Sequence, residues 1–233
     1  FLTRQNLMSK NNRVRTNPDR PALIRTHQAI LDSATSPYAQ LFATSSLTKL
    51  LTDNAGLGGQ LKIDMRNYVM NFLANKGNSL EGFVVTSLVQ LLSRITKTAW
   101  LDADNDAHRE IVTEVMNFLK QQNNTHYHIG LKIFNQLVME MNQQSPGTSL
   151  IAQRKIAVSF RHNALLQIFQ VSLQALQELQ ASQSSEARLK EQAASLVLAC
   201  LSYDFVGTSL DESTEDIGTI QVPSSWRSLI EEP

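Results

Sequence analysis

Apolar residues recur at intervals of three and four along most of the chain, which is the pattern of helices with one buried side. Ser36 followed by Pro37 is typical of a helix start, because proline fits the first helical position and serine favours the position before it. The alternation of apolar and polar residues that is typical of strands occurs almost nowhere. The pattern predicts helices over 37–53, 63–75, 79–98, 106–120, 126–142, 151–160, 163–180 and 186–202.

The first helices differ in what their surfaces carry. The helix 37–53 has the apolar residues Leu41, Phe42, Leu47, Leu50 and Leu51. The glycine-containing loop 54–60 follows it, and Asn78 with Glu81 has the spacing of a capping box before the helix 79–98. Two helices carry a second, polar stripe, formed by Thr86, Gln90, Arg94 and Lys97 in 79–98 and by Lys132, Gln136 and Glu140 in 126–142. Each of these helices therefore has two distinct surfaces, an apolar one that packs in a core and a polar one outside the core.

The helices also recur at a regular interval. The second helices of successive hairpins are predicted to begin at residues 37, 79 and 126, at intervals of 42 and 47 residues. HEAT and armadillo repeats recur every ~40–47 residues, whereas tetratricopeptide and ankyrin repeats recur every ~33–34. Burial of five Leu, Ile or Val side chains contributes about 8–15 kcal/mol per helix before entropy, so each hairpin favours stacking on the next. The predicted fold is all-α, a HEAT or armadillo type of α–α superhelix with about four to five helical hairpins.

The expected repeats cover 26–203. The segment 1–25 holds six Lys or Arg against one Asp and is predicted to be a basic, loose arm. Such an arm either is only a solvated run of charge or touches nucleic acid or an acidic partner. The segment 204–224 is predicted to be an acidic loop between repeats, and 225–233 the start of a further helix at Trp226.

The acidic loop has a second interpretation. Its acidic side chains are Asp211, Glu212, Glu215 and Asp216, with Ser213 and Thr214 between them. The loop is therefore either a plain linker or a phosphorylation or docking site.

Composition excludes several classes of protein. With 233 residues, 42% hydrophobic and 18% charged, the chain is neither collagen-like nor wholly disordered. Lys+Arg and Asp+Glu both number 21, so bulk charge gives no reason to expect nucleic acid or anionic lipid as a partner. The longest uncharged stretches, 33–48 and 162–177, are too polar and too short to span a membrane. The chain begins at Phe1 without an apolar signal segment, so we expect a fragment or processed chain and no secretory route.

No group of residues predicts catalysis or metal binding. The glycines at 56, 58 and 59 follow a helix and lack the Lys-Ser/Thr of a phosphate loop. His126 and His128 point to different sides of a helix and have no ligand partner at metal-binding spacing. Cys200 lies in an apolar run, which predicts a buried side chain and not a nucleophile. Because it is the single cysteine of the sequence, it cannot form an internal disulfide, which fits a reducing compartment. Asn123-Asn124-Thr125 matches a glycosylation acceptor, which without an export signal we interpret as coincidence.

Several segments resemble one protein family. They are 36–41 (SPYAQL), 47–50 (LTKL), 63–69 (IDMRNYV), 94–97 (RITK) with Trp100, 154–157 (RKIA), 159–161 (SFR), 203–209 (YDFVGTS), 211–213 (DES) and 222–228 (VPSSWRS). Together they resemble the amino-terminal region of the exportin-7 (Ran-binding protein 16/17) subfamily of importin-β-like nuclear transport receptors. The likeness covers roughly 30–228. Leu101-Asp102 after Trp100 departs from the Pro and second Trp of many importin-β relatives, and 1–25 does not resemble the family's opening helix.

The resemblance implies a receptor that binds Ran-GTP and protein cargo and contacts phenylalanine-glycine nucleoporins while it shuttles between nucleus and cytoplasm. It implies no enzyme activity, no metal, no nucleic acid, no membrane insertion and no cofactor except the GTP of bound Ran. In this family Ran lies on inner helices of the first repeats. The residues that would contact it here are Lys49, Gln90, Arg94, Lys97, Lys132, Gln136 and Glu140. The alternative is a HEAT-type scaffold that binds a protein partner independently of Ran.

Overall fold

The computed structural model describes residues 20–53, 57–102, 110–120, 123–145, 148–181, 186–205 and 222–231, and these ranges contain helices and short helical turns but no strand. The α-helices are α1 (Arg20–Ser33), α2 (Pro37–Thr52), α3 (Gly59–Lys76), α4 (Gly82–Ala99), α6 (Ile111–Lys120), α7 (Asn124–Asn142), α8 (Leu150–Phe160), α9 (Leu166–Ala181), α10 (Ala187–Leu201) and α11 (Arg227–Glu231). Residues Gly77–Ser79 and Ser224–Trp226 form 3-10 turns, and Arg161–Leu165 form a π-helical turn.

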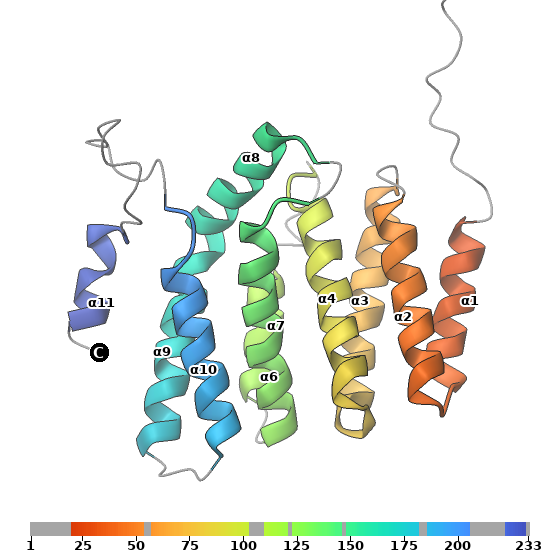
Figure 1. Ribbon diagram of the computed structural model, residues 1–233, viewed down its shortest axis with the longest axis horizontal. Helices are drawn as coiled ribbons and strands as arrows, with labels where there is room; N and C mark the ends of the chain where they lie inside the picture. The colour runs from red at the N-terminus through yellow and green to blue at the C-terminus, as the bar shows by residue number, and fades with distance from the viewer. Residues whose placement is uncertain are drawn as a thin grey trace, which may run out of the picture.

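The helices stack as antiparallel pairs in two layers (Figure 1). The pairs are α1 with α2, α3 with α4, α6 with α7, and α9 with α10. We call the first helices of the pairs (α1, α3, α6, α9) the A layer and the second helices (α2, α4, α7, α10) the B layer. Neighbouring B helices pack closely against one another, whereas neighbouring A helices do not approach as closely. The sequence predicted an all-α, HEAT-type stack of about four to five hairpins, and this is confirmed, with four pairs among the described residues.

Several boundaries differ from the predicted ones. Helix α1 begins at Arg20, inside the predicted arm 1–25, because Pro21 fits a helix start and Ile24 is buried in the core. The rest of that arm lies outside the described residues. Helix α3 begins at Gly59, so the predicted loop 54–60 is shorter, and its residues 54–56 also lie outside the described part.

The capping box expected from Asn78 and Glu81 is wrong. Asn78 lies in the 3-10 turn Gly77–Ser79, and Leu80 and Glu81 are extended, so α4 begins only at Gly82. Glu81 is the N-cap residue but makes no side-chain capping hydrogen bond. The 3-10 turn packs closely against α7, since a Cβ on Gly77 would lie 2.5 Å from Cδ1 of Ile129.

The fourth pair departs from the regular spacing. The B helices begin at residues 37, 82, 124 and 187, at intervals of 45, 42 and 63. The last interval is longer because an additional helix, α8, lies between α7 and the fourth pair. The π-helical turn Arg161–Leu165 joins α8 directly to α9, where a break was predicted. Helix α8 leans away from the row of near-parallel helices at the upper end of the stack (Figure 1).

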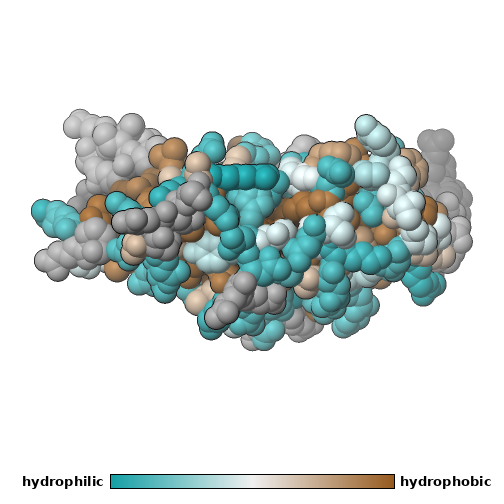
Figure 2. Space-filling model, turned by 90° about the horizontal axis from the view of Figure 1, so that it is seen from below, coloured by the Kyte–Doolittle hydropathy of each residue, from teal (hydrophilic) through white to brown (hydrophobic). Residues whose placement is uncertain are grey.

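The core lies between the two layers. Viewed from below, apolar residues reach this face in separate patches among hydrophilic residues (Figure 2). At the C-terminal end a series of ring contacts ties the helices together, from Trp100 to Phe160 (5.3 Å), Phe160 to Tyr203 (5.9 Å) and Phe205 to Trp226 (5.4 Å). The family-like segments 203–209 and 222–228 thus contribute core side chains. No helix within the described ranges combines the length and the apolar character that a bilayer crossing requires.

Candidate functional site

The polar stripes predicted on α4 and α7 face each other across the B layer, and we call this line of side chains the α4–α7 seam. Arg94 and Lys97 come from α4, and Lys132 and Glu140 come from α7. The seam forms because α4 and α7 are neighbouring B helices whose apolar stripes both turn toward the core. The structure therefore brings together residues that are more than 30 positions apart in the sequence.

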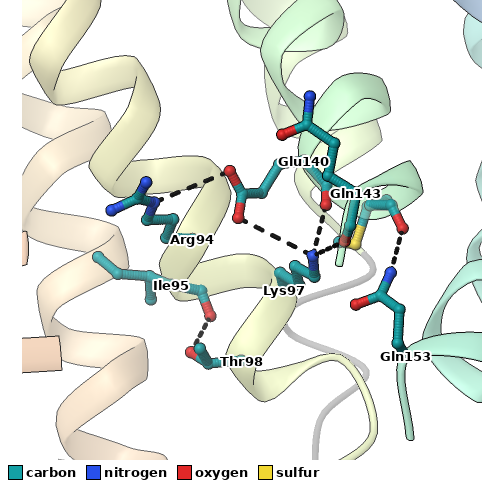
Figure 3. A network of polar contacts seen from close by, with 8 residues as sticks. Arg94, Ile95, Lys97, Thr98, Glu140, Gln143 and Gln153 are labelled. Atoms are coloured by element: carbon teal, nitrogen blue, oxygen red, sulfur yellow. Dashed lines mark hydrogen bonds and ion pairs between the residues drawn. The ribbon is translucent and has the colours of Figure 1, made fainter. Parts of the chain in front are cut away.

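Lys97 is the buried centre of this seam. Its side chain is 3% exposed and its Nζ donates a 2.6 Å hydrogen bond to the carbonyl oxygen of Glu140 and another to that of Gln143 (Figure 3). These carbonyls belong to the last turn of α7 and the residue after it, where the helix offers no backbone donor. Burial lowers the pKa of Lys97, as does Arg94, while Glu140 opposes the decrease. Lys97 therefore holds α4 to the end of α7. Its place on the predicted polar stripe suggested an outward-facing side chain, but the side chain is buried.

The end of α7 has a second donor. Nε2 of Gln153, from α8, donates a 3.0 Å hydrogen bond to the carbonyl oxygen of Met141. Gln153 and Lys97 thus approach neighbouring carbonyl groups from two different helices (Figure 3). This arrangement stabilises the turn between α7 and α8.

Glu140 connects the buried part of the seam to its exposed part. Its carboxylate lies 3.9 Å from Nζ of Lys97 and 3.8 Å from Nε of Arg94. Arg94 is 44% exposed, while the Glu140 side chain is only 12% exposed. The carboxylate therefore orients Arg94, and the rest of the guanidinium remains available to a partner.

Further along the seam lies a cluster of basic side chains. Lys132 Nζ donates a 2.6 Å hydrogen bond to Oγ1 of Thr86 on α4. Burial and the nearby Arg188 of α10 lower the pKa of Lys132. Burial, Arg188 and Lys132 together lower the pKa of His128 to about 4, so this imidazole is neutral at pH 7.

The three remaining candidates, all on the B layer, differ in exposure. Lys49 on α2 and Gln90 on α4 are exposed, and Gln136 on α7 is half-buried. Asp211, Glu212, Glu215 and Asp216 lie outside the described residues. The α4–α7 seam therefore joins most of the candidate contact residues, with Lys49 one helix away.

Three exposed aromatic residues, which we call the aromatic patch, extend this surface. Tyr38 and Phe42 of α2 are 76% and 61% exposed, and Phe83 of α4 is 42% exposed. The rings of Tyr38 and Phe83 lie 5.9 Å apart across the two helices. Phe42, one of the apolar residues noted in this helix, is exposed because it lies on the same side as Tyr38 and Lys49, at helical spacing. That spacing of 38, 42 and 49 is the signal that could have revealed the patch in the sequence.

The alternative chemical centres are part of the core. Nε2 of His126 lies 2.9 Å from the carbonyl oxygen of Ala74, and the ring packs against Phe118. Cys200 is buried, as predicted, and burial raises the pKa of its thiol to about 12. Within the described ranges, no His, Cys, Asp and Glu residues form a group that could hold a metal ion.

Comparison with known proteins gives close similarity to one group. The chain is 40% identical to exportin-7-A of Xenopus laevis over 209 residues, 86% of this chain. It is 35% identical to Ran-binding protein 17 of Homo sapiens over 222 residues, 92% of this chain, and 39% identical to Ran-binding protein 16 of Drosophila melanogaster over 86% of this chain. No protein-family model matches the chain. No solved structure matches it either.

The similarity covers most of this chain but a limited part of each relative. The chain spans about a fifth of the length of the curated relatives it matches, 19% of the Xenopus laevis protein and 20% of the Homo sapiens protein. The predicted family resemblance is confirmed over this segment. By its sequence the chain belongs, as a segment, to the exportin-7 subfamily, whose matched members bear the names exportin-7, Ran-binding protein 16 and Ran-binding protein 17.

Proposed function

We propose that this chain is a Ran-GTP-binding segment of a nuclear transport receptor. The observation that carries the proposal is the 35–40% identity to proteins named for export and for Ran binding, over 86–92% of the chain. The GTP is a ligand of Ran, and the chain itself binds no nucleotide in this proposal. The corresponding location of the whole receptor is the nucleus and cytoplasm, with passage through the nuclear pore.

The surface that we propose for Ran is the exposed side of α2 and α4, continued along the α4–α7 seam. It combines the aromatic patch with Lys49, Gln90 and Arg94. Tyr, Phe and Arg side chains are enriched at protein interfaces, and such aromatic side chains contribute most when they are surrounded by polar residues that exclude water. This composition supports a protein partner and not a small-molecule substrate.

The candidate residues have different roles in this proposal. Lys49, Gln90 and Arg94 contact Ran directly because they are exposed. Lys97 and Glu140 are positioning residues, because Lys97 is buried and the Glu140 carboxylate orients Arg94. Lys132 and Gln136 extend the contact along α7, where both are half-buried.

The test is a binding measurement with purified Ran loaded with either a non-hydrolysable GTP analogue or GDP. We expect binding to the GTP-analogue form to be at least about tenfold tighter, since a tenfold difference requires only about 1.4 kcal/mol. Arg94→Glu should weaken binding, and Arg25→Glu, the same charge change at an exposed position on α1, should not.

Two results would contradict the proposal. Equal affinity for the two nucleotide forms, or no affinity for either in the full-length receptor, would favour a HEAT-type scaffold that acts independently of Ran. Equal weakening by Arg94→Glu and Arg25→Glu would show that net charge, and not the proposed surface, controls binding.

Protein cargo and phenylalanine-glycine nucleoporins are the further partners that we propose for the whole receptor. A pocket of about 270 Å³ between α6, α7 and α9 has apolar lining from Met116, Leu119, Val171 and Ala175 and polar lining from Lys120, Tyr127, Gln174 and Glu178. Its size and lining suit one phenyl ring. Titration with a phenylalanine-glycine peptide and its serine-glycine counterpart tests this part, with Ala175→Glu as the blocking variant. Equal binding of the two peptides would exclude the pocket as the nucleoporin site.

A further inference from the structure

A groove of about 550 Å³ runs along the outward side of α8 and the π-helical turn that follows it. Its lining includes Ile151, Arg154, Lys155, Val158 and His162. These positions recur every three or four residues and therefore share one side of the helix. The groove belongs to neither the α4–α7 seam nor the aromatic patch.

The groove combines apolar surface with positive charge. Leu150 and Ile151, at the start of α8, are 70% and 72% exposed. Large aliphatic side chains with this exposure in adjacent positions form an apolar surface, and its contact with water is unfavourable in free energy. Arg154, Lys155 and His162 are exposed beside it.

Among the described residues, no carboxylate pairs with the basic side chains of the groove. None of the described residues that line it is acidic, and Arg154 and Lys155 form no ion pair with any of the described residues. Cations that lie together without carboxylates attract a negatively charged partner and repel a positively charged one. The groove is thus complementary to a segment that carries both acidic and aliphatic side chains.

Helix α8 is a firm support for such a segment. Its opposite side is buried through Gln153, Ile156 and Phe160. Nε1 of Trp100 donates a 3.1 Å hydrogen bond to Oγ of Ser159, which ties the middle of the groove to the end of α4. The π-helical turn occupies the far end of the groove, and π-helical turns occur frequently at functional sites.

We propose that this groove docks an acidic, aliphatic segment of a partner protein. The aliphatic side chains lie against Leu150 and Ile151, the carboxylates pair with Arg154 and Lys155, and His162 offers a ring nitrogen for a hydrogen bond. The site is separate from the proposed Ran surface. An experiment can therefore contradict the Ran-binding proposal and leave the groove proposal intact, or contradict the groove proposal and leave Ran binding intact.

The probe for the test is a fluorescein-labelled 14-residue peptide with Leu at every third or fourth position and Glu elsewhere. One control peptide replaces each Leu by Ser, and another replaces each Glu by Lys. Fluorescence anisotropy with the full chain should show binding of the Glu-Leu peptide, at least about fivefold weaker binding of the Glu-Ser peptide, and none of the Lys-Leu peptide. Affinity for the Glu-Leu peptide should fall as salt rises.

Matched variants locate the binding site. The double variant Arg154→Glu with Lys155→Glu should weaken binding at least about tenfold, and Leu150→Ser with Ile151→Ser at least about threefold. Arg20→Glu with Arg25→Glu makes the same change in net charge on α1 and should leave the affinity within about twofold. Circular dichroism verifies the fold of each variant, and Arg154→Gln with Lys155→Gln replaces the charge reversal if that variant unfolds.

Four results would overturn the proposal. Equal affinity for the Glu-Leu and Glu-Ser peptides would mean that only bulk charge binds, and an equal effect of the α1 variant would mean the same. Tighter binding after neutralisation of Asp211, Glu212, Glu215 and Asp216 would assign the groove to the chain's own acidic segment. Binding to vesicles of anionic lipid that is lost in Arg154→Glu with Lys155→Glu, without peptide binding, would assign it to a membrane surface.

Discussion

The A and B layers both bury a basic side chain between successive hairpins, but they satisfy it differently. In the A layer, Nη2 of Arg66 on α3 lies 2.5 Å from the carboxylate of Glu114 on α6, and Nη1 donates to Asn67. In the B layer, Lys97 donates to backbone carbonyls, and the Glu140 carboxylate is shared with the exposed Arg94. The A-layer junction uses its charges internally, whereas the B-layer junction leaves one cation facing outward. Burial and partners, more than residue type, thus separate structural cations from candidates for binding.

The largest expected effect is at Lys97. Lys97→Met nearly keeps the length of the side chain but removes the ammonium, which leaves two carbonyls without their donor and the Glu140 carboxylate without one of its two neighbouring cations. We expect a loss of about 4 kcal/mol in the free energy of unfolding. Urea titration followed by circular dichroism measures it. A smaller loss in unfolding free energy than that of Arg66→Met would contradict the expectation that Lys97 contributes more to stability than Arg66.

Arg66→Met tests the A-layer junction. The side chain of Arg66 is almost fully buried, so its removal leaves Glu114 beside an apolar group, and we expect a loss of about 3 kcal/mol. Because the pair is partly shielded from water, the loss should change little between low and high salt in the same urea titration. A loss that disappears at high salt would show that the pair behaves as a surface pair.

His128 makes the B layer sensitive to acid. The pKa of His128 is about 4 in the folded protein, whereas the ordinary value, which applies to the unfolded chain, is 6.5. Between these two pH values the unfolded chain therefore binds more protons than the folded protein. Stability from this residue is fully present above pH 6.5 and is lost as the pH falls through 4. We expect His128→Gln to reduce the fall in unfolding free energy over this range by about 2 kcal/mol. Urea titrations at pH 7, 5.5 and 4 measure it, and parallel curves for both proteins would contradict the assignment.

The smallest expected effect on stability is at Arg94. Since the Arg94 side chain is 44% exposed and lies 3.8 Å from its carboxylate partner, Arg94→Met should cost less than about 1 kcal/mol in unfolding free energy. If Arg94 contacts Ran as proposed, the same variant should weaken binding of Ran with a GTP analogue by about tenfold. Thermal unfolding and the binding assay separate the two effects. A stability loss as large as that of Lys97→Met would place Arg94 with the structural cations.

The sequence was sufficient for the repeat architecture. Pro37 marks the start of α2 as predicted, and the apolar periodicity indicated most of the helices. The apolar run around Cys200 correctly predicted a buried thiol. These features depend on local residues, so a single sequence contains the necessary information.

The sequence was less informative where distant elements meet. Lys97 occupies a polar stripe, but its burial depends on the position of the end of α7, 43 residues away. Phe42 is apolar, yet its exposure follows from the direction in which α2 packs on α1 and α4. The π-helical turn Arg161–Leu165 also has no clear sequence signal, because an ordinary α-helix and a π-helical turn favour similar residues.

The unequal spacing of the two layers has a geometric consequence. Since B helices pack more closely than A helices, each added pair rotates slightly relative to the one before it, with the B layer on the shorter arc. Repetition of this rotation bends the stack into an arch, so the aromatic patch and Arg94 lie on its inside. A rounded partner on that side would meet several successive hairpins at once, and the rotation between pairs would determine the radius of curvature of the surface that it contacts.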